Sequence, residues 1–155
     1  MIVNKTPINS NNVKMKNKDI AEAIIVNEKN EVLLQKKTPD YKFAPGVWTF
    51  FGGRIEENES PEQALKREIK EEINFDIKEF NLFKIRAYEF PPFGVRGKRY
   101  IFEVFFHGDL SQISIKEGNG FAFFAAHEVD FIKMQKFVLE DLKELLTLKR
   151  KGELS

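Results

Sequence analysis

The sequence contains no cysteine and only two histidines among its 155 residues. The lack of cysteine excludes disulfide bonds, thiol nucleophiles and thiolate metal sites. With so few histidines, we expect any bound metal to be held mostly by oxygen atoms, which favours hard ions such as Mg²⁺ or Mn²⁺.

The sequence also lacks a charge imbalance and a long apolar run. Lys and Arg number 25 against 24 Asp and Glu, for a net charge of +1, which argues against a nucleic-acid partner. No stretch approaches the roughly 18 apolar residues of a membrane span, and the polar beginning of the chain is unlike a secretory signal. We therefore expect a cytoplasmic protein with no membrane or nucleic-acid partner.

The length and the apolar content are sufficient for one domain with a real core. Residues 1–18 are rich in Asn and Lys and are predicted to form a flexible N-terminal arm, with a docked strand as the alternative. The rest of the chain, 19–155, is predicted to form a single domain.

Apolar runs and turn residues predict strands interrupted by two helices. We expect helices over 61–73 and 137–149, a long hairpin loop over 91–98, and strands near 20–26, 32–35, 47–51, 76–90, 99–107 and 121–126. This order is typical of an α+β fold with helices on the faces of a sheet.

The first of these helices has clear boundary signals. Ser60, Pro61 and Gln63 form a capping box with proline at the first helical position. Asn74 follows the last apolar residue, Ile73, where a left-handed residue is favoured.

Three carboxylates on this helix carry the chemical signal. Glu68, Glu71 and Glu72 are spaced i, i+3 and i+4, so they lie on one side of the helix beside its apolar stripe. Like charges at this spacing repel one another by a few tenths of a kcal/mol per pair, whereas a divalent cation would bridge them. A solvated acidic face is the alternative interpretation.

The segment resembles the Nudix box, Gly-x5-Glu-x7-Arg-Glu-U-x-Glu-Glu-x-Gly-U, where U is a bulky apolar residue. All but one of the defined positions match, in the residues Gly53, Glu59, Arg67, Glu68, Ile69, Glu71, Glu72 and Phe75. Asn74 stands where glycine is usual, and we expect the turn to survive because Asn tolerates a left-handed backbone.

This resemblance to the Nudix hydrolase family implies an α/β/α sandwich around a mixed β-sheet. It implies hydrolysis of a nucleoside diphosphate linked to a group X, with Mg²⁺ as cofactor and Mn²⁺ as an alternative. By the match, the metal ligands are the Gly52 carbonyl and the carboxylates of Glu68, Glu71 and Glu72. Gly53, Glu59 and Arg67 would position these ligands without binding the metal themselves, and Arg67 would orient the glutamates by charge-assisted hydrogen bonds.

The residue content of the sequence is consistent with hydrolysis by a water molecule that a metal ion activates. A metal ion neutralises the diphosphate and lowers the pKa of a bound water, and the sequence offers no cysteine nucleophile. Glu68 and Glu117 are the two candidates for the carboxylate that takes the proton. An exposed loop acid without a function is the alternative for Glu117.

A basic stretch after the helix is a candidate substrate site. Arg86, Arg96 and Arg99 are predicted to attract phosphates and Phe93 to stack on a base, with a solvated hairpin as the alternative. We expect a nucleoside triphosphate, a modified dNTP or a nucleotide sugar as substrate. The other hypotheses are a catalytically silent nucleotide-binding module and a dinucleoside polyphosphate or RNA-end hydrolase. Phenylalanines on edge strands also make a homodimer a hypothesis.

Overall fold

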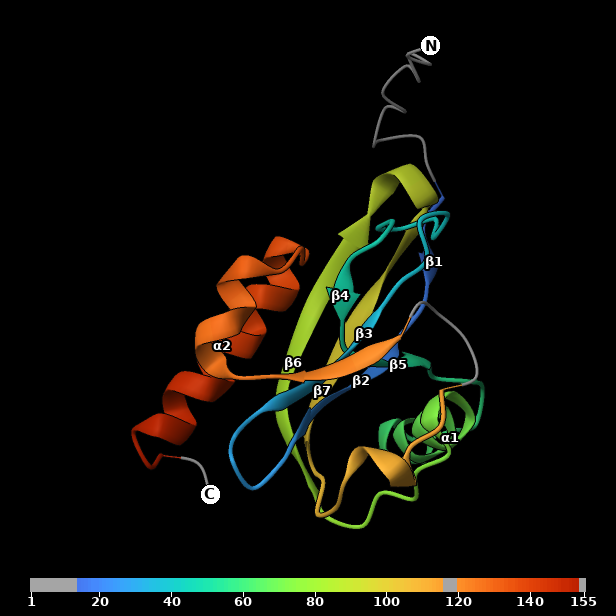
Figure 1. Cartoon of the computed structure of the whole chain (residues 1–155). Coiled ribbons are helices and arrows are strands. Elements are labelled where there is room, and N and C mark those ends of the chain that lie inside the picture. The colour runs from blue at the N-terminus through green and yellow to red at the C-terminus, as the bar shows by residue number, and fades with distance from the viewer. Residues whose placement is uncertain (1–13, 116–119, 154–155) are drawn as a thin grey trace.

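The computed structural model describes residues 14–115 and 120–153. Its strands form one mixed sheet, and its two long helices lie on opposite sides of that sheet (Figure 1). The elements are β1 Lys16–Asn17, β2 Ile20–Val26, β3 Val32–Lys36, β4 Trp48–Thr49, β5 Phe51–Arg54, α1 Pro61–Ile73, β6 Phe80–Phe90, β7 Val95–Phe105, β8 Phe121–Phe124 and α2 Lys136–Arg150. The predicted α+β class and the α/β/α sandwich are confirmed.

Strand β2 is the centre of the sheet. It pairs in parallel with β7 and antiparallel with β3 and β5, while β6 extends the sheet beyond β7. Side chains of a strand alternate between the two faces, so Ala21, Ala23 and Ile25 point toward α1, and Ile24 and Val26 toward α2.

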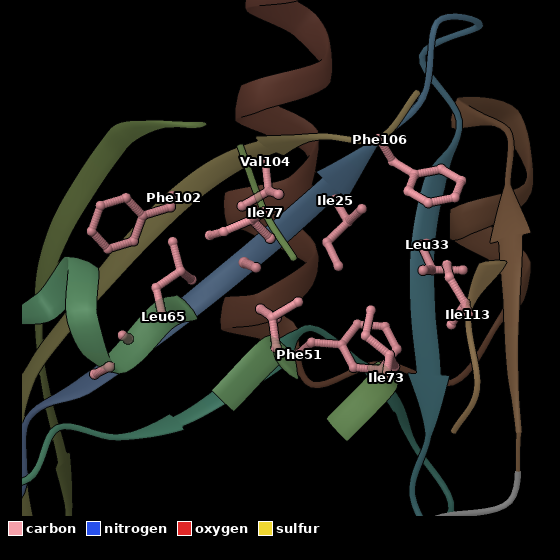
Figure 2. Close-up of a cluster of buried hydrophobic side chains, with 14 residues drawn as sticks. Ile25, Leu33, Phe51, Leu65, Ile73, Ile77, Phe102, Val104, Phe106 and Ile113 are labelled. Atoms are coloured by element: carbon pink, nitrogen blue, oxygen red, sulfur yellow. The ribbon is translucent and has the colours of Figure 1, made fainter. Parts of the chain in front are cut away.

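Each helix covers its own half of the core. Leu65, Ile69 and Ile73 of α1 are fully buried against the first face of the sheet, which includes Phe51 and Phe102 (Figure 2). On the other face, α2 buries a second set of side chains against the sheet, namely Val138, Leu142 and Leu145. Burial of apolar surface of this kind contributes about 25 cal/mol per Å² to folding, so both helices are held mainly by their apolar stripes.

The boundary signals of α1 behave as predicted. The Ser60 hydroxyl accepts from the Gln63 N–H at 3.1 Å, and the Gln63 side chain accepts from the Ser60 N–H at 2.9 Å. Asn74 ends the helix with a left-handed backbone, at φ 54°. The helix is therefore fixed at both ends, which sets the positions of the carboxylates that it carries.

The hairpin differs from the sequence prediction. Strands β6 and β7 pair as far as Phe90 and Val95, so the loop covers only 91–94 and the predicted loop over 91–98 is wrong. Gly94, at φ 62°, closes the turn early. Gly97 lies within β7, and the chain after β1 passes so close to it that a Cβ there would be 2.4 Å from the Lys18 carbonyl oxygen. The prolines and glycines of this stretch suggested a longer loop, although the residues from Val95 onward lie on a regular strand.

Two predicted strands also have different bounds. The strand expected at 76–90 begins at Phe80, and the strand expected at 47–51 is divided in two. β4 pairs with β3 and β5 pairs with β2, because the chain crosses between these neighbours at Phe50. This crossing carries Gly52 and Gly53 into the middle of the sheet, next to Glu22 and Ala21.

Near the N-terminus, Lys16 and Asn17 pair in parallel with β7. The residues 1–13 of the predicted arm lie outside the described residues, and the single domain over 19–155 stays a prediction. In the described part of the chain, neither helix combines the length and apolar character that crossing a membrane requires.

Candidate active site

Glu72 of α1 forms hydrogen bonds to two strands of the sheet, β3 and β5. Its Oε1 accepts from the Gly52 backbone N–H at 2.8 Å, and its Oε2 accepts from the Gln35 side chain at 3.0 Å. Gln35 also donates to the Phe50 carbonyl at 2.9 Å, which fixes the amide. Burial raises the pKa of Glu72 to about 7, although the two hydrogen bonds oppose this shift. The Glu72 carboxylate is thus held between Gly52 of β5 and Gln35 of β3.

The two glycines of the bend are needed for different reasons. At Gly52 the backbone has φ 144°, and a Cβ would be 2.2 Å from the Ala21 carbonyl oxygen. At Gly53 a Cβ would be 2.4 Å from the Glu68 carboxyl carbon, so the Glu68 side chain lies directly over this residue. Gly52 therefore permits the backbone path, and Gly53 makes room for a carboxylate.

Arg67 binds the acidic side chains behind the bend. Its Nε and Nη2 donate to the two oxygens of Glu59 at 2.7 and 2.9 Å, and Nη2 also donates to the Arg54 carbonyl. Its Nη1 donates to Glu68 at 2.8 Å and to Glu71 at 3.4 Å. These bonds lower the pKa of Glu59 to about 2 and raise that of Arg67. The guanidinium thus contacts Glu59, Glu68 and Glu71, and its role in orienting them for a metal stays a prediction.

All the acids gathered here offer hard oxygen donors, which are the ligands that a divalent cation prefers. Within residues 14–115 and 120–153, however, no three His, Asp or Glu side chains are grouped closely enough to hold an ion. The contacts explain this, because Arg67 binds Glu68 and Glu71 while Glu72 bonds to Gly52 and Gln35. By donor chemistry the residues fit the cation, and the assignment of Glu68, Glu71 and Glu72 as ligands stays a prediction.

A pocket of about 340 Å³ opens beside the bend, on the α2 side of the sheet. Its volume lies within the range of about 300–1,000 Å³ found for small-molecule sites. Its lining includes Gly52 and Gly53, so the pocket adjoins the carboxylates of α1. Apolar walls come from Phe50, Phe90, Phe137 and Val138, and polar groups from Glu22, Lys37, Tyr41, Arg99 and Gln135. Burial and the charges of Glu72 and Glu22 raise the pKa of the Tyr41 hydroxyl, which lines the pocket.

Of the four predicted substrate residues, only Arg99 lines this pocket. Arg86 instead pairs with acids of α2, and Arg96 is exposed on β7. Phe93 packs edge-on against Phe43, with 4.8 Å between the ring centroids. Glu117, the second candidate for the proton acceptor, lies outside the described residues.

Sequence reasoning missed two polar residues of the pocket, Glu22 and Gln135, whereas Tyr41 was expected from the sequence as a residue that could line a pocket. For Glu22 a signal was present, because it is the only charged residue in the apolar run 20–26. Gln135 lies outside the regular strands, where no periodicity predicts the direction of a side chain.

Together these features define a class of domain, an α+β sandwich whose acidic helix is set against a glycine bend beside an open pocket. The chain belongs to the NUDIX domain family, whose model matches residues 16–149. Enzymes of this family are pyrophosphohydrolases that generally use a divalent metal.

Individual relatives match shorter stretches. The 8-oxo-dGTP diphosphatase of Escherichia coli (strain K12) is 43% identical over 77 residues, which cover 50% of this chain and 59% of that protein. The CTP pyrophosphohydrolase of the same organism is 37% identical over 62 residues, 40% of this chain and 44% of that protein. The chain thus matches about half the length of these two relatives.

The fold itself is similar to solved structures over most of its length. The MutT protein from Methanosarcina mazei Go1 superposes with a TM-score of 0.74 at 18% identity, covering 89% of this chain and 98% of that chain. At this level of identity the likeness supports the fold alone.

Proposed function

We propose that this chain hydrolyses nucleoside triphosphates or modified dNTPs to the monophosphate and pyrophosphate. One observation carries the proposal: Gly52 and Gly53 belong both to the acidic site and to the lining of the pocket. A nucleoside in the pocket would therefore place its phosphates beside Glu68 and Glu72. The names of the two relatives, an 8-oxo-dGTP diphosphatase and a CTP pyrophosphohydrolase, support this choice over a nucleotide sugar.

In this mechanism Glu68, Glu71, Glu72 and the Gly52 carbonyl would hold Mg²⁺, with Mn²⁺ as an alternative. The bound ion would neutralise phosphate oxygens and lower the pKa of the attacking water. Arg67 would keep the glutamates oriented through its bonds to Glu59 and Glu68. Glu68 lies against the bend and is the described candidate for the proton acceptor, with Glu117 as the second candidate.

The pocket would hold the base and sugar. Phe50, Phe90 and Phe137 offer aromatic faces on its walls, and stacking on such faces favours a planar base. Arg54 also lines the pocket, and its guanidinium would bind a phosphate of the substrate. The residues that surround the substrate thus come mainly from the sheet and from α2, whereas the acids come from α1.

A panel of nucleotides with product identification tests the proposal. With Mg²⁺ present, we expect pyrophosphate and a monophosphate from at least one nucleoside triphosphate. Glu71→Gln should lower kcat by two or more orders of magnitude and weaken Mg²⁺ binding while the fold is retained, because it removes one charged ligand. Glu57→Gln, on an exposed neighbour, is the matched control.

Other outcomes would select the other hypotheses. Nucleotide binding without turnover across the panel would favour a silent binding module. Release of a sugar phosphate, or activity confined to dinucleoside polyphosphates or RNA ends, would overturn the proposed substrate class. The homodimer and the cytoplasmic location stay predictions.

A further inference from the structure

The floor of the pocket carries a charge on a strand that is otherwise apolar. Glu22 lies on the α2 face of β2, between Ile20 and Ile24, and lines the pocket. Its side chain is only 14% exposed. Placing a carboxylate at such a position costs free energy unless its oxygens are bonded. We therefore asked what each oxygen contacts.

One oxygen of Glu22 is fixed by Arg99. The Arg99 Nε donates to Glu22 Oε1 at 2.6 Å, and Nη1 donates to Asp141 Oδ2 of α2 at 2.8 Å. The guanidinium carbon also lies 4.7 Å from the centroid of the Phe137 ring. Arg99 is held between two carboxylates and an aromatic face, so its guanidinium is fixed in place. Through the Nε bond, it in turn orients the carboxylate of Glu22.

The second oxygen, Oε2, has no hydrogen-bond partner among residues 14–115 and 120–153. It is not one of the solvent-excluded atoms that lack a partner, so it is open to the pocket. Burial raises the pKa of Glu22, while Arg99 acts in the opposite direction. An ionised carboxylate can only accept hydrogen bonds, so a ligand that completes this site must present N–H donors.

On the basis of the proposed function, we propose that Glu22 is the residue that discriminates between nucleobases, by accepting N–H donors from a guanine-type edge. Guanine carries a ring N–H beside an exocyclic amino group, which matches a carboxylate. Thymine and uracil flank their ring N–H with two carbonyl oxygens, which a carboxylate repels. Hypoxanthine keeps the ring N–H and lacks the amino group.

Equilibrium binding of monophosphates tests this without requiring turnover. Calorimetry on the whole chain would compare dGMP, dIMP and dTMP with the wild type, Glu22→Gln and Glu140→Gln. The wild type should bind dGMP at least about tenfold more tightly than dIMP or dTMP, since a hydrogen bond to a charged group is lost in each case. Glu22→Gln should reduce this preference to within about threefold. Glu140→Gln makes the same chemical change on an exposed position of α2 and should retain the preference.

The ratio between ligands is taken within one protein, so it does not depend on how stable each variant is. If Glu22→Gln does not fold, the ranking of the three ligands by the wild type and by Glu22→Asp tests the proposal instead. Glu22→Asp is expected to weaken the binding of dGMP more than the binding of dIMP or dTMP. Equal binding of the three ligands by the wild type, or an unchanged preference in Glu22→Gln, would overturn the proposal. Pyrophosphate release from dGTP is measured separately: binding selectivity without hydrolysis would refute the proposed function alone, and hydrolysis with no effect of Glu22 on selectivity would refute this inference alone.

Discussion

At the scale of the residue, the site depends on the absence of a side chain at two positions, Gly52 and Gly53. A Cβ at position 52 would clash with the backbone of β2. A Cβ at position 53 would clash only with the end of the Glu68 side chain. The two contacts differ in kind, because a backbone atom in a sheet cannot move away, whereas a carboxylate can rotate. The two glycines therefore have separable roles in stability and in activity.

Alanine at each glycine should reveal this difference. Gly52→Ala is expected to lower the free energy of unfolding by about 2–3 kcal/mol, from a positive φ together with the backbone clash. Gly53→Ala should cost less than about 1 kcal/mol and reduce kcat about 100-fold, because it displaces Glu68. Urea unfolding and pyrophosphate release would measure the two effects. Equal losses of stability in the two variants would contradict the assigned roles.

The Glu59–Arg67 pair predicts a pH dependence of stability. Arg67 lowers the folded-state pKa of Glu59 from 4.5 to about 2, so folding favours the ionised form. The contribution to stability is therefore present above pH 4.5 and is lost as the pH falls through about 2. Between these values Glu59→Gln should show a weaker pH dependence of the urea midpoint than the wild type. Glu57→Gln should follow the wild type, and a Glu59→Gln curve parallel to the wild type would exclude this role.

At the scale of the element, α1 shows how a local signal fixes a functional group. Its capping box sets the first turn, its apolar stripe sets the rotation, and Asn74 ends it in a left-handed conformation. Since a helix rotates by about 100° per residue, these three features determine the direction of Glu68, Glu71 and Glu72 before any long-range contact forms. The position that departs from the family pattern, Asn74, adopts the backbone for which glycine is usual.

Substitutions at Asn74 measure how well asparagine serves there. Asn74→Gly should change the free energy of unfolding by less than about 0.5 kcal/mol or raise it slightly, because glycine adopts φ 54° without strain. Asn74→Ala should lower it by about 1 kcal/mol, since a Cβ disfavours this region. Urea midpoints would measure both. A large loss in Asn74→Gly would show that the Asn side chain has a further structural role.

At the scale of the whole molecule, three basic residues of β6 and β7 form ion pairs with α2. Lys84 and Arg86 pair with Glu144, and Arg86 and Arg99 pair with Asp141. Residues that suggest a phosphate site by sequence thus bind a helix that lies some 40 or more positions further along the chain. In addition to its apolar stripe, α2 is joined to the sheet by this network, and the network ends at Glu22 in the pocket.

The energetic centre of this network is Asp141, whose side chain is 2% exposed. Asp141→Ala should destabilise the protein by about 3–5 kcal/mol, because it leaves the buried Arg99 without one of its two partners. The exposed end of the network should matter less, and Glu144→Ala should cost less than about 1 kcal/mol. Denaturant unfolding would compare the two. Similar costs for the two variants would show that burial does not set the strength of these pairs.

Much of the fold was predictable because its signals are local. The capping residues, the apolar periods and the box around Gly53 and Glu72 each depend on neighbours in sequence, and the family follows from them. The length of the β6–β7 hairpin and the division of the strand at Phe50 were not predicted, since both depend on which strand passes alongside. Candidate site residues followed the same rule: the acids of α1 could be proposed from their spacing in sequence and stay a prediction, whereas nothing local singled out Glu22 or Gln135 as pocket residues.

By itself, the sequence determined that α1 forms, where it begins and ends, and that three carboxylates share one of its sides. Only the tertiary structure decided which charges are neutralised and what surrounds the pocket. Glu22, Arg99 and Asp141 are brought together from two strands and a helix. The physical reason is range: helix geometry and capping act over a few residues, whereas ion pairing and enclosure depend on elements that meet only when the sheet and both helices have packed.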